Sequence, residues 1–446
     1  MSDSLPFFDA ARLREHAKSA LAAAKRRGAT AAEVMAAVDD GLSVTVRMGE
    51  VETVERERDR SFGVTLYFGA RKGSASTSDF APAAIEETVA AAAEIARYTA
   101  EDPCAGLAPA ARMAHEFPDL DLCHPWALSP EAAIALAETC EAAARDVDAR
   151  IVNSEGATVE TGHGLAVYAN THGFVGEREG TSHDISCVVV AGNEAGMQRD
   201  YWYDSARASD DLEDAAAIGR EAARRVLARL GARSLATRKA RVLFAPEVAR
   251  SLVGHLVAAA SGGAQYMRAS FLLDAVGKRV LPEWLSFVER PHLLRGAASR
   301  AFDDEGVATV ERALVERGVL TGYVLGSYSA RRLGLETTGN AGGISNLVVE
   351  PGGKRPDEPL AALGTGFYVT ELIGQGVNTV TGDYSRGAAG FWVERGEIVH
   401  PVEEVTIAGN LKDMLVNIVA AGTDVDSRGR IQTGSLLIKE MTLAGE

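Results

Sequence analysis

The sequence of 446 residues has only four cysteines, Cys104, Cys123, Cys140 and Cys187. No two of them have the Cys-x-x-Cys spacing that marks structural zinc sites and redox motifs. So few cysteines at irregular intervals do not form the framework of a disulfide-stabilised protein, and we expect free thiols. Because no cysteine follows Cys187, the second half of the chain offers no thiolate to a metal.

Long apolar runs are also missing. The longest stretch, Leu252–Gly263, is too short and too rich in glycine to cross a bilayer. The first residues, Met1–Pro6, lack the basic segment and the apolar core of a secretory signal. We therefore expect a cytoplasmic protein that has no membrane partner.

Basic residues are outnumbered. Lys and Arg total 46 against 62 Asp and Glu, and the formal net charge is −16. Nonspecific binding to nucleic acid requires a basic surface, so this charge predicts no nucleic-acid partner. It still permits an acidic protein to contact an enzyme that acts on nucleic acid.

The first half of the chain shows helix, strands and helix in that order, twice. A length of 446 residues and a 46% hydrophobic fraction favour about three domains. We predict an amino-terminal α+β domain at 1–100, a linker at 101–125 and a middle α+β domain at 126–233. The two units form either separate layers or one composite sheet with helices on one face. The predicted helices are 8–27 after Asp9, 82–98 after Asp79, 129–147, and a last helix from Asp211 to 230. The predicted strands are 33–38, 42–48, 51–58, 63–68, 74–77, 157–160, 165–170, 173–178, 182–191 and 198–203.

The remaining residues, 238–446, differ in composition and pattern from the first half. They contain many glycines, and short strand-like runs alternate with turn signals. They predict a mostly β domain, similar to a sandwich or barrel, that carries helices at 248–260 and 411–420. The fold class is therefore α+β: two helix–strands–helix units followed by a mostly β domain. The strands predicted here are 242–247, 347–349, 367–373, 378–382, 390–394 and 435–441.

One helix in this domain looks like a metal-binding motif without its ligands. It follows the strand 242–247 and reads Arg250-Ser251-Leu252-Val253-Gly254-His255. Further blocks accompany it in order through the last two hundred residues: Phe271–Asp274, Leu281–Trp284, Phe302–Val307, Tyr328–Arg331, Thr338–Gly343, and the segment from Gly364 to Gly387. Together these blocks resemble the TldD/PmbA metallopeptidase family, in its PmbA (TldE) branch.

The resemblance implies that the zinc chemistry is missing here. In the catalytic TldD branch the matching helix carries His-Glu-x-x-x-His. On that pattern Arg250 replaces the first histidine, Ser251 replaces the glutamate, and only His255 remains. A catalytic zinc needs about three protein ligands and a general base beside its water. Arginine has no lone pair to donate, and serine takes no proton at neutral pH.

A cysteine near the carboxyl terminus completes the site of the TldD branch. The corresponding segment here reads Asp426-Ser427-Arg428-Gly429-Arg430 and has none. We therefore expect no catalytic residue and no bound metal or other cofactor in this chain, with zinc in a partner subunit. His255, a lone histidine on an apolar helix, is interpreted as structural.

Candidate residues for peptide binding or for a cavity follow from the same segments: Gly364, Gly366, Asp383, Tyr384 and Arg386. The glycines lack the Gly-Lys-Ser/Thr ending of a phosphate loop and favour tight turns and close strand approach. If the resemblance holds, that approach admits a peptide as an added strand. An Asp–Arg pair at a strand end is the simplest interpretation of Asp383 and Arg386.

Three other polar groups invite a functional interpretation. His115-Glu116 and Cys123-His124 carry metal-ligand types, but their spacing fits no zinc template. The segment Asp424–Gly429 starts like a calcium loop, yet Arg428 stands at a ligand position, so we interpret it as a polar turn. The acidic run Asp303-Asp304-Glu305 is interpreted as a solvated loop that also caps a helix or strand.

Three functions stay open at this point. By resemblance, the chain is the non-catalytic partner of a TldD-like subunit in a complex that degrades or trims unfolded peptides, in antitoxin turnover or leader removal. The second alternative is a self-sufficient homodimeric peptidase with ligands that form no visible motif. The third is a binding protein that modulates DNA gyrase.

Overall fold

The computed structural model describes residues 7–193, 196–353 and 355–445. Its first half forms one curved, six-stranded antiparallel sheet in the order β3-β2-β1-β4-β5-β6. The amino-terminal and middle units therefore share a composite sheet, joined by β1 and β4 over the register Glu33–Asn170 to Val46–Ala157. The strands are β1 (Ala31–Arg47), β2 (Glu50–Phe68), β3 (Arg71–Thr77), β4 (Ile151–Asn170), β5 (Val175–Asn193) and β6 (Gly196–Ala206).

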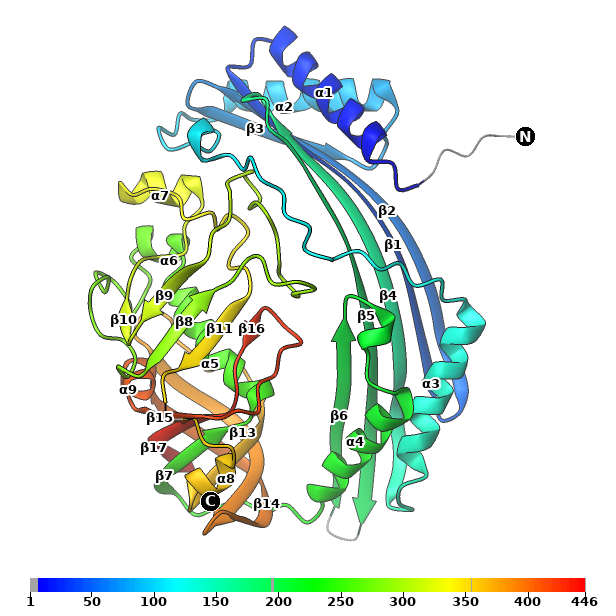
Figure 1. Ribbon diagram of the computed structural model, residues 1–446, viewed down its shortest axis with the longest axis vertical. Coiled ribbons are helices and arrows are strands. Elements are labelled where there is room, and N and C mark those ends of the chain that lie inside the picture. Colours follow the sequence, from blue (N-terminus) through cyan, green and yellow to red (C-terminus); the bar gives the residue numbers. More distant parts are fainter. Residues whose placement is uncertain (1–6, 194–195, 354, 446) are drawn as a thin grey trace.

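Four helices cover one face of this sheet in two pairs. Helices α1 (Ala10–Arg26) and α2 (Pro82–Tyr98) pack on one end, and α3 (Pro130–Arg145) and α4 (Ala215–Ala228) pack on the other. The carboxyl-terminal domain lies on the opposite, concave side (Figure 1). Even-numbered side chains of β1, such as Val34 and Val44, face the helices, and burial alternates along the strand as a period of two requires.

The strands of the first half are longer than the sequence pattern predicts. Residues 33–38 and 42–48 belong to one strand, β1, and residues 51–58 and 63–68 belong to β2. Gly41 does not interrupt β1 because it pairs with Glu57 on one side and with Gly162 on the other. Partners on both sides thus override the weak strand preference of Asp39-Asp40-Gly41.

Helix starts agree with the predicted caps at Asp9 and Ser129, whereas Asp79 precedes α2 without capping it, because the N-cap there is Ala81. Asp9 accepts a hydrogen bond from Arg12 N, and Ser129 accepts one from Ala132 N. The predicted cap at Asp211 is wrong, because α4 starts at Ala215 and is capped by Asp214. Both acids suit an N-cap, and only Asp214 directly precedes the apolar spacing that packs on the sheet.

The carboxyl-terminal domain contains two sheets. One is barrel-like, with the order β14-β13-β12-β7-β17-β15, and β14 pairs back onto β17. Its strands are β7 (Arg238–Phe244), β12 (Gly366–Ile373), β13 (Asp383–Glu394), β14 (Glu397–Asn410), β15 (Ile418–Ala421) and β17 (Leu436–Ala444). The other sheet consists of β8 (Leu285–Glu289), β9 (Arg312–Glu316), β10 (Val319–Leu320), β11 (Leu347–Pro351) and β16 (Ile431–Gln432). The predicted α+β class is confirmed.

Short helices connect these strands, and two predicted elements differ from the structure. The helices are α5 (Pro246–Ala259), α6 (Gly262–Tyr266), α7 (Ser327–Leu333), α8 (Pro359–Leu363) and α9 (Leu411–Val416). The predicted strand 378–382 is a turn, because the Asn378 carboxamide oxygen accepts hydrogen bonds from Val380 N and Thr381 N. The predicted helix 411–420 ends at Val416. The next residues form β15, which starts at Ile418 and pairs with β17.

Candidate functional site

Helix α5 carries Arg250, Ser251 and His255 and is packed by its apolar residues. It follows β7 directly, begins at Pro246 and buries Leu252, Val253 and Leu256 in the core of the domain. Because positions three and four apart share one face of a helix, Arg250 and Ser251 lie one turn before His255. The three side chains have separate partners.

Arg250 points to the amino-terminal half of the protein. Its Nη1 donates a hydrogen bond of 3.0 Å to the Tyr203 hydroxyl on β6 and lies 3.7 Å from Oδ2 of Asp426. Asp426 is nearly fully buried, and Arg428 donates to it through Nε at 2.9 Å. Arg428 also stacks over the rings of Trp202 and Tyr203. An ion-pair network therefore occupies the region between α5 and the segment Asp426–Arg430.

The charge of this network acts on the carboxyl group of Asp426. Burial alone raises the pKa of that group, but the hydrogen bonds from Arg428 and the charge of Arg250 outweigh burial and lower it. Asp426 is thus held as an anion between two fixed cations. A divalent cation placed there meets both guanidinium groups, and their positive charge opposes its binding.

Ser251 is a helix residue without a chemical partner outside its own turn. Its Oγ donates to the carbonyl oxygen of Val248 at 2.7 Å. The hydroxyl is therefore engaged by the backbone one turn earlier, as is common for serine in helices.

His255 meets two residues of β13. Its ring centroid lies 6.1 Å from that of Tyr384, edge to face, and the guanidinium of Arg386 is close enough to act on both groups. Burial and the positive charge of Arg386 lower the pKa of His255, which keeps the imidazole neutral. Burial raises the pKa of Tyr384 although Arg386 opposes this effect. Among the described residues, His255 Nε2, Tyr384 Oη and Arg386 Nε have no hydrogen-bond partner.

The other predicted cavity residues lie apart from this cluster. Gly366 pairs with Val393, at the end of β13 remote from Tyr384, and a Cβ there meets the Arg241 carbonyl oxygen at 2.4 Å. Gly364 ends α8 with φ of +69°, a conformation that favours glycine. Asp383 accepts hydrogen bonds from Thr381 and Asn410, and these replace the expected pair with Arg386.

The acidic run at 303–305 is only in part the predicted solvated loop, because Asp304 is exposed but Asp303 is not. Asp303 is fully buried and accepts hydrogen bonds from Glu305 N, Val307 N and Ala341 N. Burial still raises its pKa to about 6. Glu305 does cap a helix, because its Oε2 accepts a hydrogen bond of 2.8 Å from Ser327 N at the start of α7. The pattern of three acids does not distinguish which one the loop buries.

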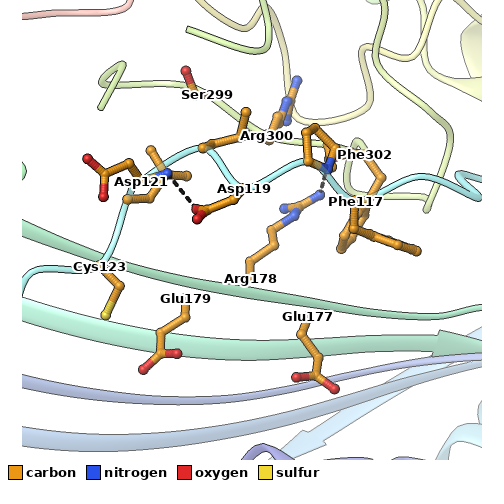
Figure 2. A pocket seen from close by; sticks show the side chains of 14 residues that line it. Phe117, Asp119, Asp121, Cys123, Glu177, Arg178, Glu179, Ser299, Arg300 and Phe302 are labelled. Atoms are coloured by element: carbon orange, nitrogen blue, oxygen red, sulfur yellow. Dashed lines mark hydrogen bonds between the residues drawn. The ribbon is translucent and has the colours of Figure 1, made fainter. Parts of the chain in front are cut away.

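The linker contributes a cavity that sequence reasoning missed. Linker residues, β5 and the segment Ser299–Phe302 enclose about 410 Å³ (Figure 2). Arg178 reaches from β5 across this space, donates to the Phe302 carbonyl oxygen at 2.7 Å and pairs with Asp304. The residues that line the cavity come from three distant parts of the sequence, so no local sequence motif predicts it.

Family models match almost the whole chain in three consecutive parts. The PmbA/TldA metallopeptidase domain 1 matches residues 32–96, the central domain matches 123–230, and the C-terminal domain matches 237–445. The chain belongs to the PmbA/TldD metallopeptidase family. Metalloprotease PmbA of Escherichia coli O157:H7 is 51% identical over 426 residues, covering 96% of this chain and 94% of that protein. A PmbA homologue of Haemophilus influenzae is 46% identical, with coverage of 97% and 96%.

Solved structures agree with this assignment. A Bacteroides thetaiotaomicron protein described as a proposed modulator of DNA gyrase superposes with a TM-score of 0.92 at 29% identity, covering 97% of this chain and 99% of that one. TldE of Thermococcus kodakarensis shares the fold with a TM-score of 0.83 at 20% identity, with coverage of 96% and 100%. The predicted membership in the PmbA branch is therefore confirmed. No helix among the described residues has the length and apolar character needed to cross a bilayer.

Proposed function

We propose that this chain is the non-catalytic subunit of a TldD/TldE-type zinc metallopeptidase that degrades or trims unfolded peptides. The observation that carries the proposal is the position of Arg250. It stands where the catalytic branch has a zinc ligand, and its guanidinium contacts Tyr203 and Asp426. The catalytic zinc then belongs to a TldD-like partner. The biological roles that fit are antitoxin turnover and removal of leader peptides.

The pairing with a homologous partner has a physical basis. Two homologous chains inherit the same surface patch and therefore form a pseudo-two-fold dimer readily. Once one subunit holds the zinc, the other needs only to close the cavity and guide an extended peptide. Its own ligand positions are then available for packing, as the contacts of Arg250, Ser251 and His255 illustrate.

Arg386 is the residue of this region best suited to a peptide. Tyr384 is buried to 1% exposure and serves as packing, whereas Arg386 is half-buried. No carboxylate pairs with Arg386 within the described parts of the chain. A guanidinium without an anionic partner is suited to a peptide carbonyl or carboxylate.

The test is a reconstitution. The chain and a TldD-like protein from the same organism are purified separately, and cleavage of an unfolded peptide is measured for each alone and for the mixture. We expect cleavage to require the partner, with this chain inactive by itself. Cleavage by this chain alone overturns the proposal in favour of a self-sufficient peptidase. Specific binding to DNA gyrase without any cleavage by the mixture overturns it in favour of a gyrase modulator.

A further inference from the structure

Three side chains of metal-ligand type meet outside the degenerate motif. Cys123 comes from the linker, His163 from β4 and Glu179 from β5. The Sγ of Cys123 lies 3.5 Å from Nε2 of His163, and the same nitrogen lies 2.9 Å from Oε1 of Glu179. The three ligand atoms are all within 4.8 Å of one another.

The fold brings these residues together through the register of β4 and β5. His163 pairs with Thr181, and Glu179 lies two residues from Thr181, so His163 and Glu179 project from the same face of the sheet. Strand β6 pairs with β5 only from His183 onward, and the linker runs along β5 beyond that point.

Backbone hydrogen bonds fix the linker on both sides of Cys123. Thr181 N donates to the Leu122 carbonyl oxygen at 2.9 Å, and His124 N donates to the Thr181 hydroxyl at 2.9 Å. Figure 2 shows Cys123 directed from the linker toward β5, where Glu179 lies. The backbone at Cys123 is therefore held in place before any ligand binds.

The geometry differs from that of a cysteine–histidine catalytic pair. There the nucleophile contacts one ring nitrogen and the acid orients the imidazole through the other. Here Cys123 and Glu179 both face Nε2 of His163. One ring nitrogen carries a single proton or a single lone pair, so Cys123 and Glu179 must share it instead of each making a separate hydrogen bond.

A tetrahedral zinc ion would bring these three groups together, with the exposed Glu179 carboxylate moving from its hydrogen-bond distance of 2.9 Å to about 3.3 Å from Nε2. Zinc–sulfur and zinc–nitrogen bonds of about 2.3 and 2.0–2.1 Å place the two ligand atoms about 3.5 Å apart at the tetrahedral angle. The separation of Cys123 Sγ and His163 Nε2 is 3.5 Å. A thiolate and a carboxylate together also match the charge of a divalent cation.

The surroundings leave one coordination position open. The His163 side chain is 17% exposed, and Phe8 stacks on its ring at 3.7 Å between centroids, which fixes the plane of the imidazole. Glu179 is more exposed, and with Cys123 it lines the 410 Å³ cavity. The cavity can therefore supply water to a fourth position.

We propose that Cys123 Sγ, His163 Nε2 and the Glu179 carboxylate bind one zinc ion, with water as the fourth ligand. Binding requires the thiolate and the His163 tautomer with its proton on Nδ1, so the thiol proton passes to solvent. The ion joins the linker to the sheet at the edge that β6 leaves uncovered. This revises the expectation that the chain binds no metal, and it is independent of the proposed partner role, because the site does not involve α5.

The test measures zinc on the full chain purified alone. After dialysis against limiting Zn²⁺, we expect one zinc per chain by elemental analysis. Cys123→Ser and His163→Gln should each weaken binding at least tenfold. Cys104→Ser is the matched control, because Cys104 is another half-buried linker thiol. His255→Ala controls for the α5 motif, and both control variants should bind one zinc.

Cobalt provides a second readout that tests for the thiolate directly. Co²⁺ bound at this site should give a sulfur-to-cobalt charge-transfer band that is absent from Cys123→Ser. Circular dichroism of that variant without metal establishes that it is folded. Zinc content unchanged in Cys123→Ser, or zinc lost only in His255→Ala, overturns the proposal. Peptide cleavage is measured separately, with and without the TldD-like partner, so failure of the zinc site is distinguished from failure of the partner role.

Discussion

The guanidinium of Arg250 donates a hydrogen bond of 3.0 Å to the hydroxyl of Tyr203. Arg250 belongs to α5 of the carboxyl-terminal domain, and Tyr203 belongs to β6 of the composite sheet. Arg250 thus joins the carboxyl-terminal domain to the composite sheet. Two predictions follow for Arg250, one on stability and one on activity.

Replacing Arg250 with methionine should lower the free energy of unfolding by about 1–3 kcal/mol, because buried Asp426 and the Tyr203 hydroxyl each lose a partner. The measurement is urea unfolding of Arg250→Met, Tyr203→Phe and the double variant. A coupling energy of at least about 0.5 kcal/mol between the two sites is expected. Strictly additive effects contradict a direct Arg250–Tyr203 interaction.

Restoring two motif residues should not create a peptidase. The variant Arg250→His with Ser251→Glu has the His-Glu-x-x-x-His pattern that the resemblance implies for the catalytic branch, but the segment Asp426–Arg430 still has no cysteine and retains Arg428. We expect no cleavage by this variant alone, measured with the unfolded peptide that the reconstituted complex cleaves. Zinc-dependent cleavage by the variant shows that the missing residues on α5 were the sole deficiency.

His255→Ala should leave the peptidase activity of the complex with its TldD-like partner within about twofold of the unaltered complex. His255 packs against Tyr384, and in the proposed function it does not bind zinc. Size-exclusion chromatography confirms assembly of the variant complex. Activity that is abolished while assembly stays intact assigns a direct role to His255.

The stability of the chain should fall on acidification below about pH 6.5 in a way that depends on His255. Its folded pKa is lowered by burial and by Arg386, so the unfolded chain takes up a proton first as the pH falls. The stability contribution is therefore complete above the ordinary histidine pKa and is lost as the pH falls toward the folded value. His255→Gln should flatten this part of the curve of unfolding free energy against pH.

Arg386 should contribute to the low pKa of His255. Arg386→Met removes a positive charge beside His255, so the folded pKa of the imidazole should rise toward its ordinary value. Nuclear magnetic resonance titration of the His255 ring protons measures this shift. An unchanged titration shows that burial alone sets the pKa.

Gly390→Ala should destabilise the chain by about 1–3 kcal/mol, because a Cβ at this position meets the Tyr368 carbonyl oxygen at 1.9 Å. Gly63→Ala is the matched control in β2, where a Cβ has nothing within 4 Å. We expect the control to change stability by less than about 1 kcal/mol, measured by the same urea unfolding. Equal effects of the two substitutions indicate that backbone conformation, not close approach, determines both.

The sequence predicts local structure well where one face is regularly apolar. The helices after Asp9 and Ser129 follow from capping residues and spacing, and both are in place. The lengths of β1 and β2 do not follow, because Gly41 continues a strand only when both neighbours pair with it. Local preference contains no information about those neighbours.

The degenerate motif on α5 is visible in the sequence, but its partners are not. Arg250 contacts Tyr203 and Asp426, residues far from it in sequence, and no spacing rule connects them. The cluster of Cys123, His163 and Glu179 is hidden for the same reason. The adjacent Cys123-His124 pair attracts attention in the sequence, whereas the fold directs Cys123 to a different histidine.

The pairing of β1 with β4 also constrains the order of events during synthesis. While only the first hundred residues have left the ribosome, β1 pairs with β2 on one side and presents an unpaired edge on the other. The edge stays unpaired until β4, which ends at Asn170, has been made. Long unpaired strand edges promote association with other chains. Because the two amino-terminal units share one sheet, the exposed edge of the first is covered only when the second has been translated.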